Sequence, residues 1–272
     1  MFCFNRSDSN CNESLINMNN SSSYSLNKVP LVTLFFWIIK IMATTVGETA
    51  ADYLNFNLKL GLGITSILMS VLLAFFLVIQ VKQKKYIPWI YWVNVLFISV
   101  AGTLITDNLV DNVGISLEVT TLFFSLLLAW VFYAWYQSER TLSILSINTP
   151  KREIYYWLTI LLTFALGTSA GDLFSEGLKL GYLLSTIIFA FLICAVLILR
   201  MRFNLSSVIA FWIAYILTRP LGASFADYLA QPVSYGGLGL GMEKTSVVFL
   251  VAIICVVLYL TVSKKDLERT NK

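Results

Sequence analysis

The chain has 272 residues, of which 58% are hydrophobic and 12% charged, and it contains no histidine. A soluble domain usually carries about twice that share of charged residues, so the composition favours a membrane protein and leaves little room for a soluble domain. The formal net charge is +4, but the basic residues form short clusters between apolar runs, which argues against a nucleic-acid partner.

Apolar runs of about 18 residues or more are long enough to cross a bilayer, because about 20 helical residues span its hydrocarbon core. We predict eight such helices, with membrane lipid around them. In chain order they are 30–51, 61–81, 88–106, 117–137, 154–173, 180–200, 205–226 and 243–262. The expected fold class is therefore an all-α polytopic membrane protein.

The two ends of the chain are more polar. Residues 1–27 are rich in Ser and Asn and lack the apolar stretch of a signal peptide, so we expect a disordered cytoplasmic tail. The membrane domain is expected at 28–264, followed by a short cytoplasmic tail at 265–272. With the N-terminus inside, fourteen basic residues lie on the cytoplasmic side and three on the other, and the positive-inside rule then places both termini in the cytoplasm.

One pattern, an aromatic residue and Trp, nine residues, Gly, four residues and Asp, occurs four times. Its copies carry Phe36, Trp37, Gly47 and Asp52; Tyr91, Trp92, Gly102 and Asp107; Tyr156, Trp157, Gly167 and Asp172; and Phe211, Trp212, Gly222 and Asp227. The pattern predicts four parallel two-helix repeats, at about 28–86, 87–150, 151–204 and 205–264. Because each repeat has two spans, all four aspartates end on the same, outer side, around a central pseudo-symmetry axis.

The Gly and Trp positions of the pattern predict how the repeats pack. Small side chains flank most of the glycines at a spacing of four residues, which is typical of closely packed membrane helices. We interpret the Trp pairs as an aromatic belt at the membrane interface, with burial between repeats as the alternative.

Polar side chains follow the repeated helices in steps of four residues from the Asp, and residues at that spacing share one helical face. The first helix carries Asp52, Glu48, Thr44 and Lys40, and the other three carry shorter versions of the stripe. Lys40 lies about 15 Å into its helix, near the bilayer midplane. An ionisable group in a span costs about 3 kcal/mol or more unless it is paired or hydrated, so we expect Lys40, Glu48 and Arg219 to face a partner or a water-filled cavity.

Two interpretations of these charges remain open. In the structural one, Glu48 pairs with Arg219 or Lys40, and the four aspartates are solvated helix ends. In the functional one, the excess of carboxylates collects cations, as rings of acidic side chains do at pore mouths. The candidate substrate-binding residues are then Glu48, Asp52, Asp107, Asp172 and Asp227.

A metal ion, if one is bound, would have oxygen ligands, because the chain has no histidine and no cysteine motif. Oxygen ligands favour hard ions such as Mg²⁺, Mn²⁺ or Ca²⁺. The candidate ligands are Glu48, Asp52 and Asp172.

The seventh helix contains Pro220, which removes a backbone hydrogen bond and tends to kink a helix. Arg219 precedes it, and the segment 231–241 that follows the helix contains four glycines, at positions 236, 237, 239 and 241. We therefore take Lys40, Arg219 and Pro220 as candidate gating or ion-pair residues.

The sequences FWIIK at 36–40, GET at 47–49, LGT at 166–168, LTRPLGA at 217–223 and GGLGL at 236–240 resemble those of a bacterial family of uncharacterised, predicted "membrane-anchored" integral membrane proteins. The resemblance covers about residues 28–262. It implies a multi-pass protein of the bacterial inner (plasma) membrane, and it supplies no substrate and no catalytic residue.

We expect a secondary transporter or channel for a small cation or other small solute, with a hard divalent metal such as manganese or magnesium as one substrate class. The alternative is a non-catalytic accessory or structural membrane subunit. We expect no enzyme and no cofactor: histidine-dependent nucleophilic chemistry is excluded, and SAGD at 169–172 lacks the first Gly of the intramembrane aspartyl protease signature. The sequence leaves the direction of transport, the coupling ion and the oligomeric state open.

Overall fold

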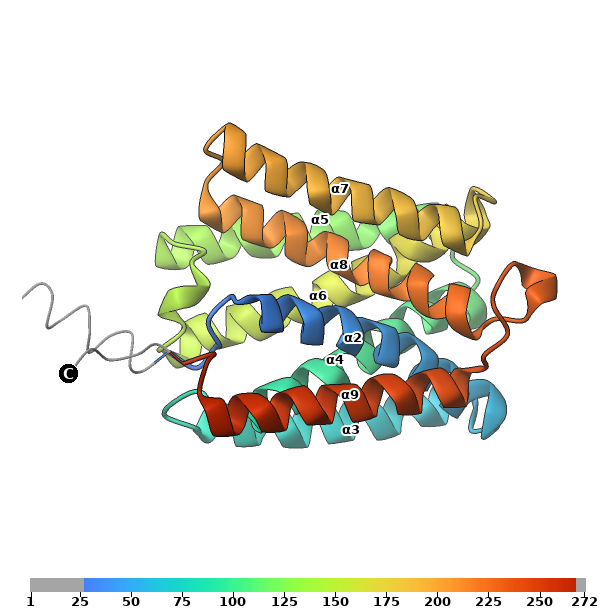
Figure 1. Ribbon diagram of the computed structural model, residues 1–272, viewed down its shortest axis with the longest axis horizontal. Coiled ribbons are helices and arrows are strands. Elements are labelled where there is room, and N and C mark those ends of the chain that lie inside the picture. The colour runs from blue at the N-terminus through green and yellow to red at the C-terminus, as the bar shows by residue number, and fades with distance from the viewer. Residues whose placement is uncertain (1–26, 268–272) are drawn as a thin grey trace, which may run out of the picture.

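The structure is a computed structural model that describes residues 27–267 (Figure 1), so nearly all of the expected tails lie outside the described residues. In this range every regular element is a helix, and eight helices are long and apolar enough to cross a membrane, as predicted. They are α2 (Leu34–Asp52), α3 (Gly61–Lys82), α4 (Pro88–Asp107), α5 (Leu117–Glu139), α6 (Pro150–Asp172), α7 (Tyr182–Arg202), α8 (Ser207–Ala230) and α9 (Met242–Ser263).

The eight helices form an inner ring and an outer layer. The motif-bearing helices α2, α4, α6 and α8 make an inner ring in which each contacts the next and α8 contacts α2. Each outer helix packs on the inner helix of the following repeat: α3 on α4, α5 on α6, α7 on α8, and α9 back on α2. Of the apolar stretch of each inner helix, 50–72% is buried, against 17–22% for the outer helices, which leaves the outer layer to face lipid.

The repeated glycines mark the four crossings of the inner ring. A Cβ atom added to any of them would overlap the next inner helix. In ring order the contacts join Gly47 to Ser99, Gly102 to Phe164, Gly167 to Arg219, and Gly222 to Thr44. Each partner lies three residues before the glycine of its own repeat, so the same close approach occurs four times around the axis. The prediction that these glycines serve close helix packing is confirmed.

Three inner helices continue beyond their motif aspartate through one π-helical turn. These turns are η1 (Tyr53–Asn57), η2 (Asn108–Asn112) and η4 (Leu173–Gly177). They lengthen the spans beyond the ends predicted near 51, 106 and 173, and they place the aspartates about one turn inside the end of the bundle. The sequence did not predict these turns, because no recognised composition marks a π turn.

The fourth inner helix ends differently. α8 is helical through Pro220 and stops at Ala230, and the glycine-rich segment 231–241 then folds back onto its last turn. The backbone hydrogen bonds of this return run from Leu238 to Tyr228, from Leu240 to Leu229 and from Gly241 to Ala230. The segment is thus anchored to α8 along the unpaired carbonyls of the helix end.

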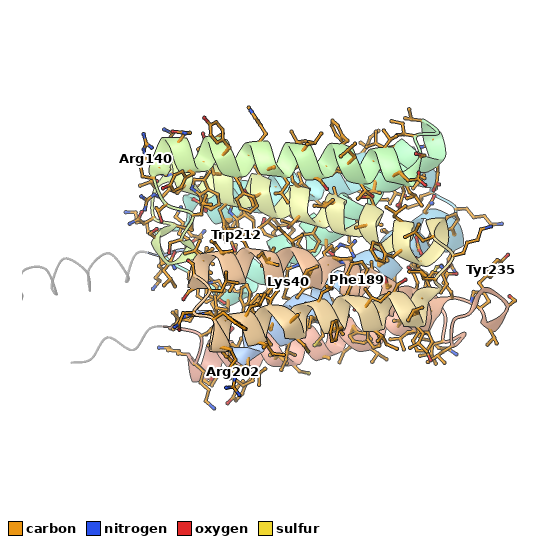
Figure 2. All side chains as sticks on the ribbon, turned by 90° about the horizontal axis from the view of Figure 1, so that it is seen from above. Lys40, Arg140, Phe189, Arg202, Trp212 and Tyr235 are labelled. Atoms are coloured by element: carbon orange, nitrogen blue, oxygen red, sulfur yellow. The ribbon has the colours of Figure 1, made fainter. Side chains whose placement is uncertain are left out.

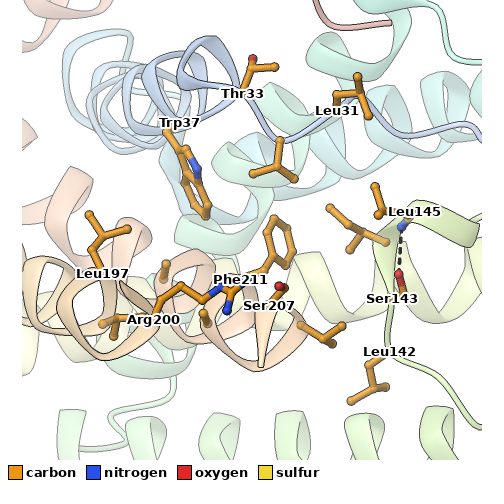
Figure 3. A pocket seen from close by; sticks show the side chains of 16 residues that line it. Leu31, Thr33, Trp37, Leu142, Ser143, Leu145, Leu197, Arg200, Ser207 and Phe211 are labelled. Atoms are coloured by element: carbon orange, nitrogen blue, oxygen red, sulfur yellow. Dashed lines mark hydrogen bonds between the residues drawn. The ribbon is translucent and has the colours of Figure 1, made fainter. Parts of the chain in front are cut away.

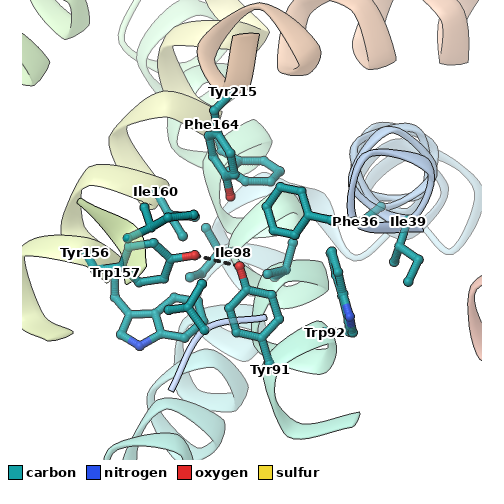
Figure 4. Close-up of a cluster of buried hydrophobic side chains, with 14 of the residues drawn as sticks. Phe36, Ile39, Tyr91, Trp92, Ile98, Tyr156, Trp157, Ile160, Phe164 and Tyr215 are labelled. Carbon is teal, nitrogen blue, oxygen red and sulfur yellow. Dashed lines mark hydrogen bonds between the residues drawn. The ribbon is translucent and has the colours of Figure 1, made fainter. Parts of the chain in front are cut away.

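The two ends of the bundle differ in character. We call the end that holds residues 27 and 267 the terminal end, and the end that holds the motif aspartates the carboxylate end. Near the terminal end the inner ring is filled by aromatic side chains (Figure 4), and the hydroxyls of Tyr91 and Tyr156 lie 2.6 Å apart. Phe36, Tyr91 and Tyr156 are each at most 2% exposed, so aromatic side chains are closely packed at this level.

The motif tryptophans belong to the same packing. Trp92, Trp157 and Trp212 are at most 6% exposed and contact neighbouring aromatic rings. The favoured interpretation of an interfacial belt is therefore wrong for these three, and the alternative, burial between repeats, is correct. The physical reason is that four repeats around one axis leave a central volume that only large side chains fill.

Candidate cation site

A cavity of ≈ 220 Å³ lies on the axis of the inner ring at the carboxylate end. Seven of its lining residues carry carboxylates: Glu48, Asp52, Asp107, Asp111, Asp172, Glu176 and Asp227. Gln231 and the apolar Phe56, Val110 and Leu117 complete the lining. Its outer residues Phe56, Asp111 and Glu176 are exposed, whereas Glu48 is 5% exposed, so the cavity opens outward and ends on Glu48.

All five residues proposed from the sequence as substrate-binding lie in this lining. The four motif aspartates reach it from four different helices, because each occupies the same place in its repeat. Asp227 is 6% exposed, and Asp52, Asp107 and Asp172 are partly exposed. The solvated helix ends of the structural interpretation fit the three partly exposed aspartates but not Asp227.

Sequence reasoning missed the outer ring of the cavity. Its members are Phe56, Asp111, Glu176 and Gln231, which each follow a motif aspartate by four residues. One further step of four along the polar stripe would have found them. The predicted spans ended close to the aspartates, so the polar stripe was expected to end there too. In the structure, π turns continue three of these helices beyond the aspartates.

Three of the carboxylates converge more closely than the rest. Glu48, Asp172 and Asp227 can each present one carboxylate oxygen such that the three oxygens lie within 4.8 Å of one another. Glu48 and Asp172 were proposed as metal ligands from the sequence, together with Asp52. In the described part of the chain, Asp227 takes the place of Asp52 in the compact group.

Arg219 closes the base of the cavity. Its side chain is fully buried, and its Nη2 donates to Glu48 Oε2 at 2.7 Å and to Thr168 Oγ1 at 2.8 Å. The same nitrogen contacts Thr103 Oγ1, and Nη1 donates to the backbone oxygen of Thr44 at 3.2 Å. One guanidinium thus bridges all four inner helices, and the ion pair considered in the sequence between Glu48 and Arg219 is present.

Lys40 lies one level farther from the cavity, in the middle of the bundle (Figure 2). Its Nζ is 3.8 Å from the ring centre of Phe164 and 4.3 Å from that of Tyr215, and it has no hydrogen-bond partner in the described structure. Cation–π contacts are therefore the only direct compensation that the described residues offer this charge. Together with the tyrosines below it, Lys40 separates the cavity from the terminal end.

A larger groove of ≈ 520 Å³ lies near the terminal end, between the start of α2, helices α7 and α8, and the segment 142–145 (Figure 3). Its walls are mainly Leu, Val, Ala, Trp37 and Phe211, with Arg200 at one side. It lacks a group of converging polar side chains and faces the lipid side of the bundle, so we do not assign it a functional site.

Comparison with known proteins agrees with the internal symmetry. Residues 35–86, 90–141, 155–206 and 210–266 each match one family, which is described as Repeat of Unknown Function (DUF347). No curated protein and no solved structure matches the chain. The four matches begin at the same place in each repeat and cover most of the chain, and the protein therefore belongs to the DUF347 repeat family.

Proposed function

We propose that this protein is a secondary transporter for a small cation in the bacterial inner membrane. The observation that carries the proposal is the cavity on the repeat axis, which is lined by seven carboxylate side chains. The distribution of basic residues supports cytoplasmic termini, and the cavity then opens away from the cytoplasm.

The charge balance of the cavity favours a cationic substrate. Within residues 27–267 the only basic group in an ion pair with a lining carboxylate is Arg219, which pairs with Glu48. None of the four motif aspartates has an ion-pair partner there. A carboxylate inside a membrane protein needs a compensating charge, so the cavity requires protons, cations or both.

The closed axis favours a carrier over an open channel. Below the cavity, Arg219 and then Lys40 occupy the centre of the ring, and both are fully buried. Positive side chains in a pore repel cations. The aromatic side chains of the terminal end follow, so a cation passes only after a rearrangement that opens this half of the bundle and closes the other, as alternating access requires.

Arg219 has a specific part in this scheme as a built-in counter-ion. Its ion pair with Glu48 neutralises the deepest carboxylate when no substrate is bound. A cation that binds the other oxygen of Glu48 weakens this ion pair, and a weaker contact among the four helices alters the packing of the ring. Substrate binding would in this way be coupled to the conformational change.

Flux into proteoliposomes that hold the purified protein tests the proposal. Mn²⁺, Mg²⁺, Ca²⁺, Na⁺ and K⁺ are offered in turn, with a pH dye inside the vesicles to report proton coupling. Glu48→Gln should abolish flux, and so should the double variant Glu48→Gln/Arg219→Gln, in which no buried charge is left unpaired. Glu243→Gln is the matched control, because Glu243 is exposed at the same end and does not line the cavity.

Wild-type flux in the folded double variant would overturn the roles assigned to Glu48 and Arg219 in transport. Absence of flux for every ion and for protons, from wild-type protein shown to be folded, would overturn the proposal and would favour the accessory-subunit alternative. Because Asp107 lies nearer the opening, we expect Asp107→Asn to reduce flux less than Glu48→Gln does.

A further inference from the structure

We propose that the base of the cavity is a binding site for a hard divalent metal ion, with Glu48, Asp172 and Asp227 as its protein ligands. This inference rests on the proposed function in one respect, that the bound ion is the transported substrate. The site itself is argued from the positions of these three side chains.

The geometry fits one central ion. Oxygen ligands lie about 2.1 Å from Mg²⁺ and about 2.3–2.6 Å from Ca²⁺, so oxygens on opposite sides of such an ion are about 4–5 Å apart. The three carboxylates offer oxygens within 4.8 Å of one another, which is inside that range. The cavity of ≈ 220 Å³ also has room for the several waters that complete the coordination of a hard cation.

Asp227 provides an independent indication of a ligand. Only 6% of this residue is exposed, so it is more than nine-tenths buried, and it lines the cavity. Among the described residues its carboxylate has neither a hydrogen-bond donor nor an ion-pair partner. A buried carboxylate without a partner is costly, so a group that is not part of the chain is expected to satisfy it.

Glu48 is prepared for a second partner. In the described structure its Oε2 accepts hydrogen bonds from Arg219 and Thr103. Its Oε1 accepts none, and the residue lines the cavity. Glu48 therefore has one oxygen available for a metal while the other remains on the guanidinium.

The net charge of the three ligands and Arg219 favours a divalent over a monovalent ion. The three ligands carry three negative charges when ionised, and the guanidinium of Arg219 compensates one of them. Two negative charges remain, which one divalent cation neutralises and one monovalent cation does not. All ligand atoms are carboxylate oxygens, and such donor sets favour Mg²⁺, Mn²⁺ or Ca²⁺ over soft metals.

The pseudo-symmetry of the ring supplies matched controls. Asp52 and Asp107 occupy the same repeat position as Asp172 and Asp227 and line the same cavity, but they are outside the compact group. Replacing any one of the four by Asn removes the same charge from the same cavity. A metal site made of Glu48, Asp172 and Asp227 should lose much more affinity when Asp172 or Asp227 is replaced than when Asp52 or Asp107 is replaced.

The test is Mn²⁺ binding to the purified protein in detergent, measured by electron paramagnetic resonance of free Mn²⁺ and by calorimetry. We expect one site per chain, with affinity reduced at least about tenfold in Asp172→Asn and Asp227→Asn, because the loss of even a residue that only supports a metal ligand typically costs about 10–100-fold. We expect changes of less than about threefold in Asp52→Asn and Asp107→Asn, and competition by Mg²⁺ but not by Na⁺.

Three results would overturn the site: no Mn²⁺ binding by folded protein, equal losses in all four variants, or losses confined to Asp52→Asn and Asp107→Asn. The flux assay separates this failure from that of the proposed function. Transport of a monovalent or organic cation by protein that does not bind Mn²⁺ would leave the transporter standing and remove the metal site. Specific Mn²⁺ binding without any flux would keep the metal site and remove transport.

Discussion

Arg219 and Glu48 are 171 residues apart in the sequence, and their side chains form a buried ion pair of 2.7 Å at the centre of the inner ring. Glu48 stands where the other repeats have Thr103, Thr168 and Ala223, and Arg219 stands where they have Thr44, Ser99 and Phe164. Each charge has thus arisen at one of four equivalent positions. Because α8 and α2 are neighbours in the closed ring, the two substitutions meet.

The ion pair predicts a strongly coupled double-mutant cycle. Arg219→Gln should lower the free energy of unfolding by about 3–5 kcal/mol, because it leaves Glu48 buried without its counter-charge. The double variant with Glu48→Gln should recover a large part of that loss. Thermal and denaturant unfolding in detergent measures both, and strictly additive losses would contradict the prediction. The partly exposed pair Arg152–Glu139, at 2.8 Å, is the control, with an expected coupling of at most about 1 kcal/mol.

The glycine crossings predict a contrast between two helical glycines. A Cβ on Gly102 would lie 2.7 Å from Phe164 Cβ and 3.1 Å from the backbone nitrogen of Ala165, so Gly102→Ala must separate α4 from α6. We expect a loss of about 1–3 kcal/mol in unfolding free energy. Gly63 in α3 has open space at the same position, so Gly63→Ala should be neutral or should stabilise by up to about 1 kcal/mol. Equal effects in unfolding experiments would show that helix propensity, not packing, controls both sites.

We expect the protein to become more stable when the charge of Lys40 is removed. Its ammonium group is buried without a hydrogen-bond partner in the described structure, and its cation–π contacts offset only part of the cost. Lys40→Met, which keeps the length of the side chain, should raise the free energy of unfolding by about 1–3 kcal/mol. Lys40→Arg keeps the charge and should show no such gain. A less stable Met variant would mean that Lys40 has a partner beyond the described contacts.

At the terminal end, we expect the protonation of Asp266 to make the stability of the fold depend on pH. Its side chain accepts a hydrogen bond of 2.7 Å from the hydroxyl of Tyr86, and the residue is 2% exposed, although the sequence suggested a solvated tail from 265 onward. Burial raises the pKa of Asp266 above its ordinary value, and the hydrogen bond from Tyr86 offsets part of that rise. The folded state therefore binds the proton of Asp266 more tightly than the unfolded state does. The stability that this protonated carboxyl group contributes is present at low pH and is lost as pH rises through the raised pKa.

Melting temperatures in detergent between roughly pH 4 and pH 7 test this sign. Compared with Asp266→Asn, wild type should lose stability as pH rises through this window. Tyr86→Phe removes the contribution that lowers the pKa of Asp266, so the loss should extend to higher pH in that variant. A wild type that gains stability relative to Asp266→Asn as pH rises would contradict the assignment.

The sequence by itself determined the helical class, the eight spans and the four repeats, because each rests on a local or periodic signal. Length and apolar composition are sufficient for a membrane helix. The repeated spacing from Trp to Gly to Asp shows that the repeats share one structure, and parallel repeats place Asp52, Asp107, Asp172 and Asp227 at the same level. The shared level of these four aspartates was therefore predictable before any contact was known.

Only the tertiary structure decided which residues meet. Three features depend on contacts between distant segments: the packing of each outer helix on the following repeat, the pairing of Glu48 with Arg219 rather than with Lys40, and the place of Asp227 in the compact group. Periodicity assigns a side chain to a helix face, but the order of helices around the ring determines its neighbours. The π turns likewise depend on the packing of the helix ends, and they carry Asp111 and Glu176 into the cavity.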